Sequence, residues 1–117
     1  HALVEHKAPH TRSRQHIKGV VEGEGRGHFE GKIYVDPIAQ KTEAYQLSNF
    51  LLLSDEALAT AQPNLEILAD DVKASHGATF GPLDPEALFY LRSRGMPLKE
   101  AESALIDGFC REIAHAP

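Results

Sequence analysis

The sequence predicts a mainly β fold, in which coils of a parallel β-solenoid are followed by a two-helix C-terminal segment. Short apolar runs lie between Pro and Gly residues over the first two thirds of the chain. A pattern of a strand followed by Asp repeats along that stretch, and the pattern becomes helical after Gly81. We therefore expect solenoid coils over residues 1–82 and a helical segment over residues 83–117.

The apolar runs of the first part predict strands because they are too short for helices and are bounded by turn-forming residues. Three of them continue into an aspartate that a small or branched apolar residue follows two positions later: Asp36, Asp55 and Asp70. Their spacings of 19 and 15 residues suit uneven coils that stack on one another. The side chains expected to point inward are Val20, Ile33, Val35, Leu51, Leu53 and Ile67.

The last third of the chain carries local signals for two helices. Asp84 and Pro85 provide an N-cap and a first-turn proline, and Gly95 provides the end of the first helix. A second helix is predicted by apolar residues at helical spacing on one face: Leu98, Ala101, Leu105, Phe109 and Ile113. Such a face covers either the end of the solenoid or a partner protein.

The amino-acid composition argues against several classes of protein. The net charge of −5 over 117 residues argues against general nucleic-acid binding. No apolar run approaches the roughly 18 to 20 residues of a membrane span, so we expect a soluble protein. The single cysteine, Cys110, predicts a reducing compartment and an inert helix thiol. Four basic side chains and one acidic side chain within residues 1–20 indicate a solvated strand region or an edge that faces an anion or a partner.

Other candidate sites have weaker support. The three aspartates are typical either of a sugar-cleaving hydrolase or lyase or, more simply, of side chains bonded to their own turns. Residues 23–27 (Gly-Glu-Gly-Arg-Gly) lack the Lys-Ser/Thr ending of a phosphate loop and favour a tight turn. His6 and His10 are four residues apart, but Pro9 argues against the helix that a metal site would need, so both are expected on the surface.

Several motifs together resemble the C-terminal part of the SufB/SufD family, and more closely its SufD branch. They include residues 12–15 (Arg-Ser-Arg-Gln), 39–46 (Ala-Gln-Lys-Thr-Glu-Ala-Tyr-Gln), 69–73 (Ala-Asp-Asp-Val-Lys), 75–79 (Ser-His-Gly-Ala-Thr) and 88–95 (Leu-Phe-Tyr-Leu-Arg-Ser-Arg-Gly). The resemblance implies a right-handed parallel β-helix that lacks its N-terminal region, since the sequence begins at His1 without a methionine.

The same resemblance implies a function. It indicates a non-enzymatic scaffold subunit for iron-sulfur cluster assembly that pairs with a SufB-type subunit and docks the SufC-type ATPase, in the bacterial cytoplasm or in a plastid. No nucleic acid or membrane is expected as a partner. Because the missing coils leave strand edges unpaired, we expect a homodimer of the isolated chain.

The site residues follow from the family motifs. His76 matches the histidine that faces the SufB subunit, so it is expected to bind iron or a transient cluster that is shared with that partner. The simpler alternative is a structural histidine bonded to a turn. Ala74 stands where SufD sequences often have cysteine, which leaves only the imidazole as a ligand in this segment. The residues expected to dock SufC are Leu88, Phe89, Tyr90, Arg92, Arg94, Met96 and Phe109.

Overall fold

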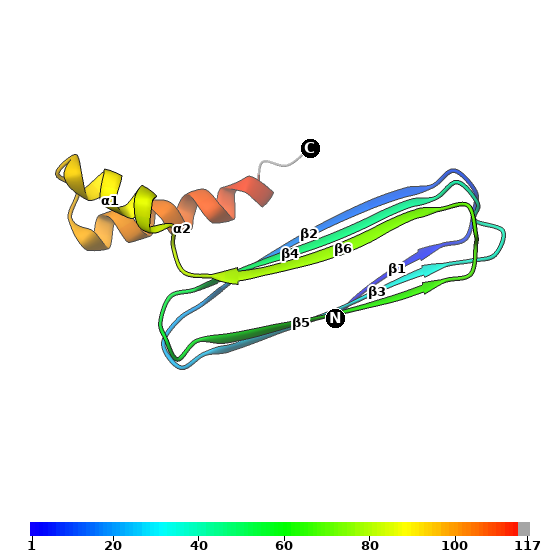
Figure 1. Cartoon of the computed structure of the whole chain (residues 1–117), viewed down its shortest axis with the longest axis horizontal. Helices are drawn as coiled ribbons and strands as arrows, with labels where there is room; N and C mark the ends of the chain where they lie inside the picture. Colours follow the sequence, from blue (N-terminus) through cyan, green and yellow to red (C-terminus); the bar gives the residue numbers. More distant parts are fainter. Residues whose placement is uncertain (115–117) are drawn as a thin grey trace. The chain divides into compact units, whose positions relative to one another are not determined.

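The computed structural model describes residues 1–114, which form six strands followed by two helices (Figure 1). The strands are β1 (Ala2–His6), β2 (Arg12–Val21), β3 (Arg26–Val35), β4 (Glu43–Leu52), β5 (Leu58–Ile67) and β6 (Lys73–Gly81). The helices are α1 (Pro85–Ser93) and α2 (Leu98–Ala114). The two helices expected after Gly81 are therefore present.

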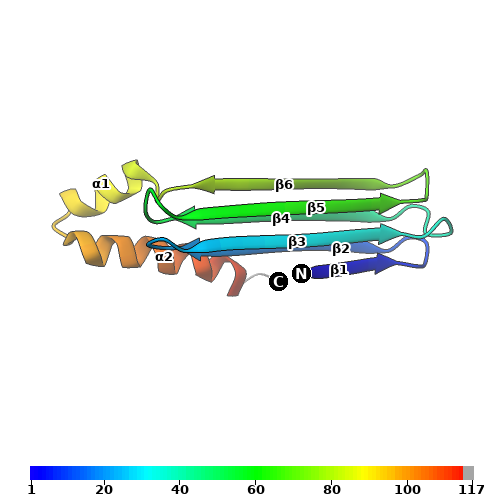
Figure 2. The ribbon, with the colours of Figure 1, turned by 90° about the horizontal axis from the view of Figure 1, so that it is seen from below.

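The strands form two parallel sheets of three strands each. One sheet has the order β1-β3-β5 and the other has the order β2-β4-β6. All arrows within a sheet point the same way in Figure 1, and Figure 2 shows the same strands from a second direction. The register of β1 and β3 sets Val4 beside Ile33 and His6 beside Val35. Odd-numbered strands thus belong to one sheet and even-numbered strands to the other.

The prediction of a parallel β-helix, or β-solenoid, is wrong. The strands form two separate open sheets instead of closed coils. Each apolar run of two or three residues corresponds to only part of a strand. Strands β2 to β6 are nine or ten residues long and continue through polar positions. Gln15 of β2 and Gln46 of β4, whose side chains meet across the two strands, are 31 residues apart and not 19 or 15. The repeat inferred from the aspartates does not describe this pairing.

Two compact units can be distinguished in the chain. The first comprises His1–Ile17, Gly27–Ser48 and Thr60–Ala78. The second comprises Lys18–Arg26, Asn49–Ala59 and the chain from Thr79 onward.

One cluster of buried apolar side chains belongs to the first unit. Ile33 and Val35 are fully buried and cluster with three buried alanines, Ala39, Ala44 and Ala69. Four partly buried side chains pack against this cluster: Leu65, Ile67, Val72 and Ala74. The prediction that Ile33 and Val35 point inward is confirmed. The prediction for Val20 in the second unit is wrong: Val20 is exposed and its neighbour Val21 is buried, because successive side chains of a strand alternate between faces.

The start and the end of α1 follow the signals in the sequence. The Asp84 carboxylate accepts a hydrogen bond from the Glu86 amide at 3.0 Å, and Pro85 occupies the first turn. Gly95 adopts a φ of 92°, and its amide donates to the Arg92 carbonyl. This left-handed conformation ends the helix, because a residue with a Cβ would be strained there.

Candidate functional site

His76 lies on β6, an edge strand of the β2-β4-β6 sheet. Ala74 of this strand packs against the apolar core, as does Val72 just before the strand. Side chains alternate along a strand, so His76 belongs to the same face as Ala74. Among residues 1–114, β6 pairs within its sheet only with β4, and His76 is exposed. The edge position therefore leaves the imidazole accessible to a second protein chain.

Two glutamine side chains lie beside His76 on the neighbouring strands of the sheet, Gln46 on β4 and Gln15 on β2. The Thr42 carbonyl accepts a hydrogen bond from the Lys73 amide at 3.0 Å, and this register sets Gln46 of β4 beside His76. Gln46 is buried and donates to the Gln15 side chain of β2 at 3.1 Å. The neighbours of the imidazole are thus amide groups, which donate and accept hydrogen bonds but do not titrate.

Within residues 1–114, the side chains near His76 do not form a metal centre. No group of three or more His, Cys, Asp or Glu side chains within residues 1–114 is arranged to hold a metal ion. Cys110 is an exposed thiol on α2 in the second unit. Ala74 packs against the apolar core two residues before His76 on the same face. His76 therefore offers a single nitrogen ligand from this segment of β6.

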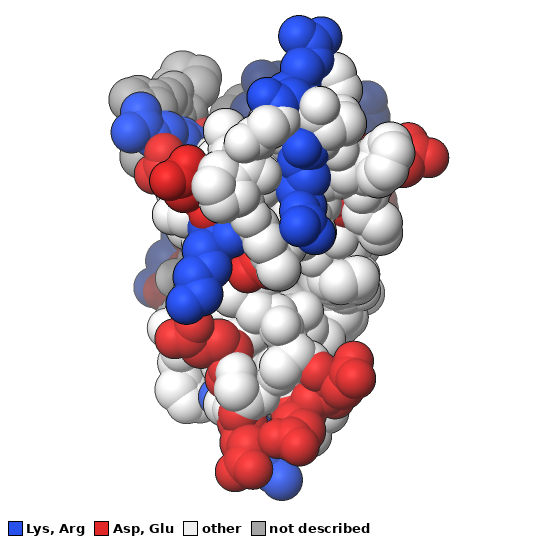
Figure 3. Space-filling view, turned by 90° about the vertical axis from the view of Figure 1, so that its left-hand side faces the viewer, with Lys and Arg blue, Asp and Glu red and all other residues white. Residues whose placement is uncertain are grey.

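The expected docking residues of α1 are unevenly exposed. Phe89 and Tyr90 are 74% and 54% exposed, whereas Leu88 is half-buried. Arg92 and Arg94 are exposed, and the Arg94 guanidinium lies 4.9 Å from the centre of the Tyr90 ring. The helix thus presents two aromatic rings beside two cations. Figure 3 shows groups of Lys and Arg next to uncharged surface on the side of the molecule that faces the viewer.

The remaining docking candidates are more enclosed. Met96 and Phe109 are half-buried. The ammonium group of Lys18, whose side chain is 5% exposed, lies 4.2 Å from the centre of the Phe109 ring and donates to the Phe109 carbonyl at 3.0 Å. It also forms an ion pair with Glu112. These contacts attach α2 to β2 within the second unit, so Phe109 already has an intramolecular role.

The alternative sites of the sequence analysis do not assemble. Asp36 and Asp70 follow β3 and β5 of one sheet, whereas Asp55 follows β4 of the other sheet. The Asp36 carboxylate accepts a hydrogen bond from the Ile38 amide at 3.2 Å, as a turn residue does. Residues 22–25 form a tight turn in which Gly23 has a φ of 59°. The glycine-rich segment therefore shapes a turn, as its sequence predicts.

His6 is a buried residue that the sequence placed wrongly on the surface. It is 4% exposed at the end of β1. Its Nδ1 and Nε2 atoms lie 2.7 Å and 2.8 Å from the hydroxyls of Thr11 and Ser13. Burial lowers the pKa of His6 below its ordinary value of 6.5. No local pattern marks this network, because its partners become neighbours only when the chain turns from β1 to β2.

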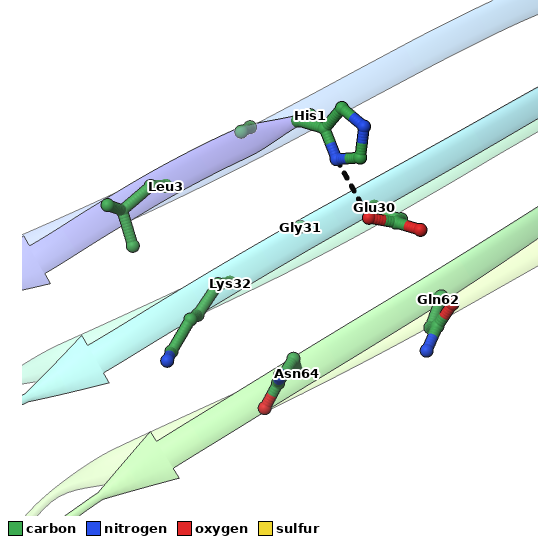
Figure 4. A pocket seen from close by; sticks show the side chains of 8 residues that line it. His1, Leu3, Glu30, Gly31, Lys32, Gln62 and Asn64 are labelled. Atoms are coloured by element: carbon green, nitrogen blue, oxygen red, sulfur yellow. Dashed lines mark ion pairs between the residues drawn. The ribbon is translucent and has the colours of Figure 1, made fainter.

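A further pocket of about 370 Å³ lies against β1, β3 and β5 (Figure 4). The charged side chains that line it are already paired. His1 Nδ1 lies 2.7 Å from the Glu30 carboxylate, as the figure shows, and Lys32 pairs with Glu66 at 3.0 Å. These ion pairs make the pocket a weaker candidate than the edge at His76.

Comparison with known proteins shows to which family this chain belongs. Residues 1–109 match the family model described as "SUF system FeS cluster assembly, SufBD core domain". The chain belongs to the SufBD core domain family. The resemblance that the sequence motifs indicated is therefore confirmed. SufBD relatives include the iron-sulfur cluster assembly protein SufD of Escherichia coli, which is 43% identical over 97% of this chain.

Two other SufBD relatives show how widely the similarity extends. The chain is 40% identical to SufD of Bacillus subtilis over 83% of its length. It is 43% identical to the chloroplastic protein ABCI7 of Arabidopsis thaliana over 90% of its length. The chain spans about a quarter of the length of these relatives: 27%, 22% and 22%, respectively. None of the helices in residues 1–114 of this SufBD chain has the length and hydrophobicity needed to cross a membrane.

Proposed function

We propose that this chain is part of a SufD-type, non-enzymatic scaffold subunit for iron-sulfur cluster assembly. The observation that carries the proposal is the 43% identity to SufD of Escherichia coli over 97% of the chain. Because bacterial and chloroplastic relatives both match, the proposed location is the bacterial cytoplasm or a plastid.

The proposed partner at the edge of the β2-β4-β6 sheet is a SufB-type subunit. An edge strand has backbone N–H and C=O groups that a second chain can pair with, and β6 is such a strand. His76 is exposed on this strand. A partner that pairs along β6 would bring its own side chains close to the imidazole.

The proposed cargo of this interface is iron or a transient iron-sulfur cluster. A neutral imidazole is a competent ligand for iron, and it donates less electron density than a thiolate does. A cluster held by His76 together with thiolates of the partner is therefore easier to release than one held by thiolates alone. The neighbouring amides of Gln46 and Gln15 add no competing charge.

The proposed docking site for the SufC-type ATPase is the α1 surface of Phe89, Tyr90, Arg92 and Arg94. Exposed aromatic rings beside arginines are the side chains that most often dominate protein interfaces. Phe89 and Tyr90 have this exposure in the structure, whereas Leu88, Met96 and Phe109 are partly enclosed.

Replacement of His76 by alanine in the full-length protein tests the cluster site. We expect cluster maturation in cells to fall at least about tenfold at matched protein level, because the scaffold loses its ligand. The folded structure should persist, since His76 is exposed. The measurement is the activity of iron-sulfur enzymes in a strain that depends on this subunit.

Two further variants make this test specific. His76→Cys should retain part of the maturation activity, because a thiolate also binds iron. His28→Ala removes another exposed histidine, on β3, and should have no effect on maturation. Wild-type maturation with His76→Ala would show that His76 is only a structural residue of β6.

A further inference from the structure

A second pocket, of about 450 Å³, lies against the middle of β2, β4 and β6 within the first unit. Three consecutive residues of each strand line it, and none of the nine is an aspartate or a glutamate. They are Arg14, Gln15, His16, Tyr45, Gln46, Leu47, Ser75, His76 and Gly77. A pocket of this size is large enough for a small organic molecule.

The side chains of this pocket divide between the two faces of the sheet. Gln15, Gln46 and His76 belong to the inner face described above. Arg14, His16, Tyr45, Leu47, Ser75 and Gly77 alternate with them and so belong to the outer face. A Cβ placed at Gly77 would lie 3.5 Å from Leu47, which shows that these two neighbours share the outer face. The side chains on the outer face thus lie on the opposite side of the sheet from the imidazole of His76.

Arg14 is a cation of the outer face that lines the pocket and has no acidic partner among the described residues. Its guanidinium lies 6.0 Å from the centre of the Tyr45 ring and forms no ion pair within residues 1–114. Arg12, two residues earlier on the same face, is already paired with Glu43 at 2.6 Å. The contact with Tyr45 orients the guanidinium while its N–H donors stay available for an anion.

The neighbours of Arg14 complete a site of mixed character. Ser75 and Tyr45 have hydroxyl groups that donate to oxyanions. The Tyr45 ring and Leu47, which is 41% exposed, form an apolar wall, and the absence of a side chain at Gly77 leaves space beside that wall. We propose that the outer face of the β2-β4-β6 sheet binds a small organic oxyanion, with Arg14 holding its phosphate or carboxylate group and Tyr45 and Leu47 contacting its organic part.

The test is calorimetric titration of the full-length protein with four probes: phenyl phosphate, benzoate, inorganic phosphate and phenol. We expect phenyl phosphate or benzoate to bind with a Kd below about 1 mM and inorganic phosphate to bind more weakly, because it has no group for the apolar wall. Binding of phenyl phosphate alone would identify the ligand as a phosphate ester, and binding of benzoate alone would identify it as a carboxylate. Absence of binding by both, or equal binding of phenol, would overturn the proposal.

Matched variants locate the binding. Arg14→Gln should weaken binding of the better anionic probe about tenfold, which is the usual effect of losing a charge-assisted hydrogen bond. Arg12→Gln, on the same face of the same strand, should change the affinity less than about twofold, because Arg12 is already neutralised by Glu43. Equal losses in the two arginine variants would place the anion elsewhere and overturn the assignment to Arg14.

Discussion

At the scale of single residues, the environment of a side chain decides its chemistry. Two histidines illustrate this. His76 is exposed on an edge strand, whereas His6 is buried and both of its ring nitrogens contact hydroxyl groups. The first is accessible to a metal or a partner. The second is held in a hydrogen-bond network, in which Thr11 also contacts Thr42 of the neighbouring turn at 3.1 Å.

The burial of His6 predicts a loss of stability in mild acid. Burial lowers the pKa of His6 below 6.5, so the unfolded chain takes up this proton at a higher pH than the folded chain does. The contribution of His6 to the free energy of unfolding should therefore be complete above pH 6.5, decline as the pH falls below 6.5 and level off below the folded-state pKa. Denaturant titrations between about pH 7.5 and about pH 5 measure this dependence.

A His6→Gln variant is the control for that prediction. Its amide retains a donor and an acceptor for Thr11 and Ser13 but does not titrate in this range. The other histidines contribute equally to both proteins, so the difference between the two pH profiles reports His6. Parallel profiles would contradict the prediction.

At the scale of elements, α1 combines strong local determinants with an exposed surface. Its N-cap and its terminating glycine fix the helix without extensive burial, since none of its residues is buried. The aromatic residues of α1 are therefore not needed for a core.

We expect Tyr90→Glu in the full-length protein to reduce capture of the SufC-type ATPase at least about tenfold, because a carboxylate replaces an aromatic anchor beside Arg94. Ile38→Glu is a matched control, since Ile38 is 65% exposed in a turn of the first unit. Pull-down of the purified ATPase measures the effect, and circular dichroism checks that the helices persist. If Tyr90→Glu and Ile38→Glu capture the ATPase equally well, the docking surface lies elsewhere.

At the scale of the whole chain, the open sheets predict self-association. The edge strands β1, β5, β2 and β6 each pair with one strand of their sheet among residues 1–114, so each leaves one row of backbone groups without a strand partner. We expect the isolated chain to form a homodimer, with a light-scattering mass of twice 12.8 kDa. Ser75→Lys on β6 and Gln62→Lys on β5 test which edge pairs, because a lysine discourages strand addition. A monomeric mass at high protein concentration would refute the prediction.

Local sequence signals determined the C-terminal helices and the family. The contacts of the Asp84 cap and the Gly95 terminus lie within two or three residues along the chain, so the local sequence specifies them. Motifs such as residues 75–79 were sufficient to indicate the SufB/SufD family and to select His76. The apolar run that contains Ile33 and Val35 was also sufficient to predict a strand whose side chains point inward, because a short apolar run bounded by turns is a strong strand signal.

The tertiary structure alone decided how the strands pair and what surrounds each polar residue. Period-2 alternation specifies which residues share a face, but it carries no information about which strands become neighbours. Pairing of β2 with β4 joins residues 31 positions apart, such as Gln15 and Gln46, and the sequence repeat of the aspartates did not reveal it. The same long-range pairing sets Arg14 over Tyr45, and the turn after β1 buries His6. Both contacts arise between segments that only the fold brings together.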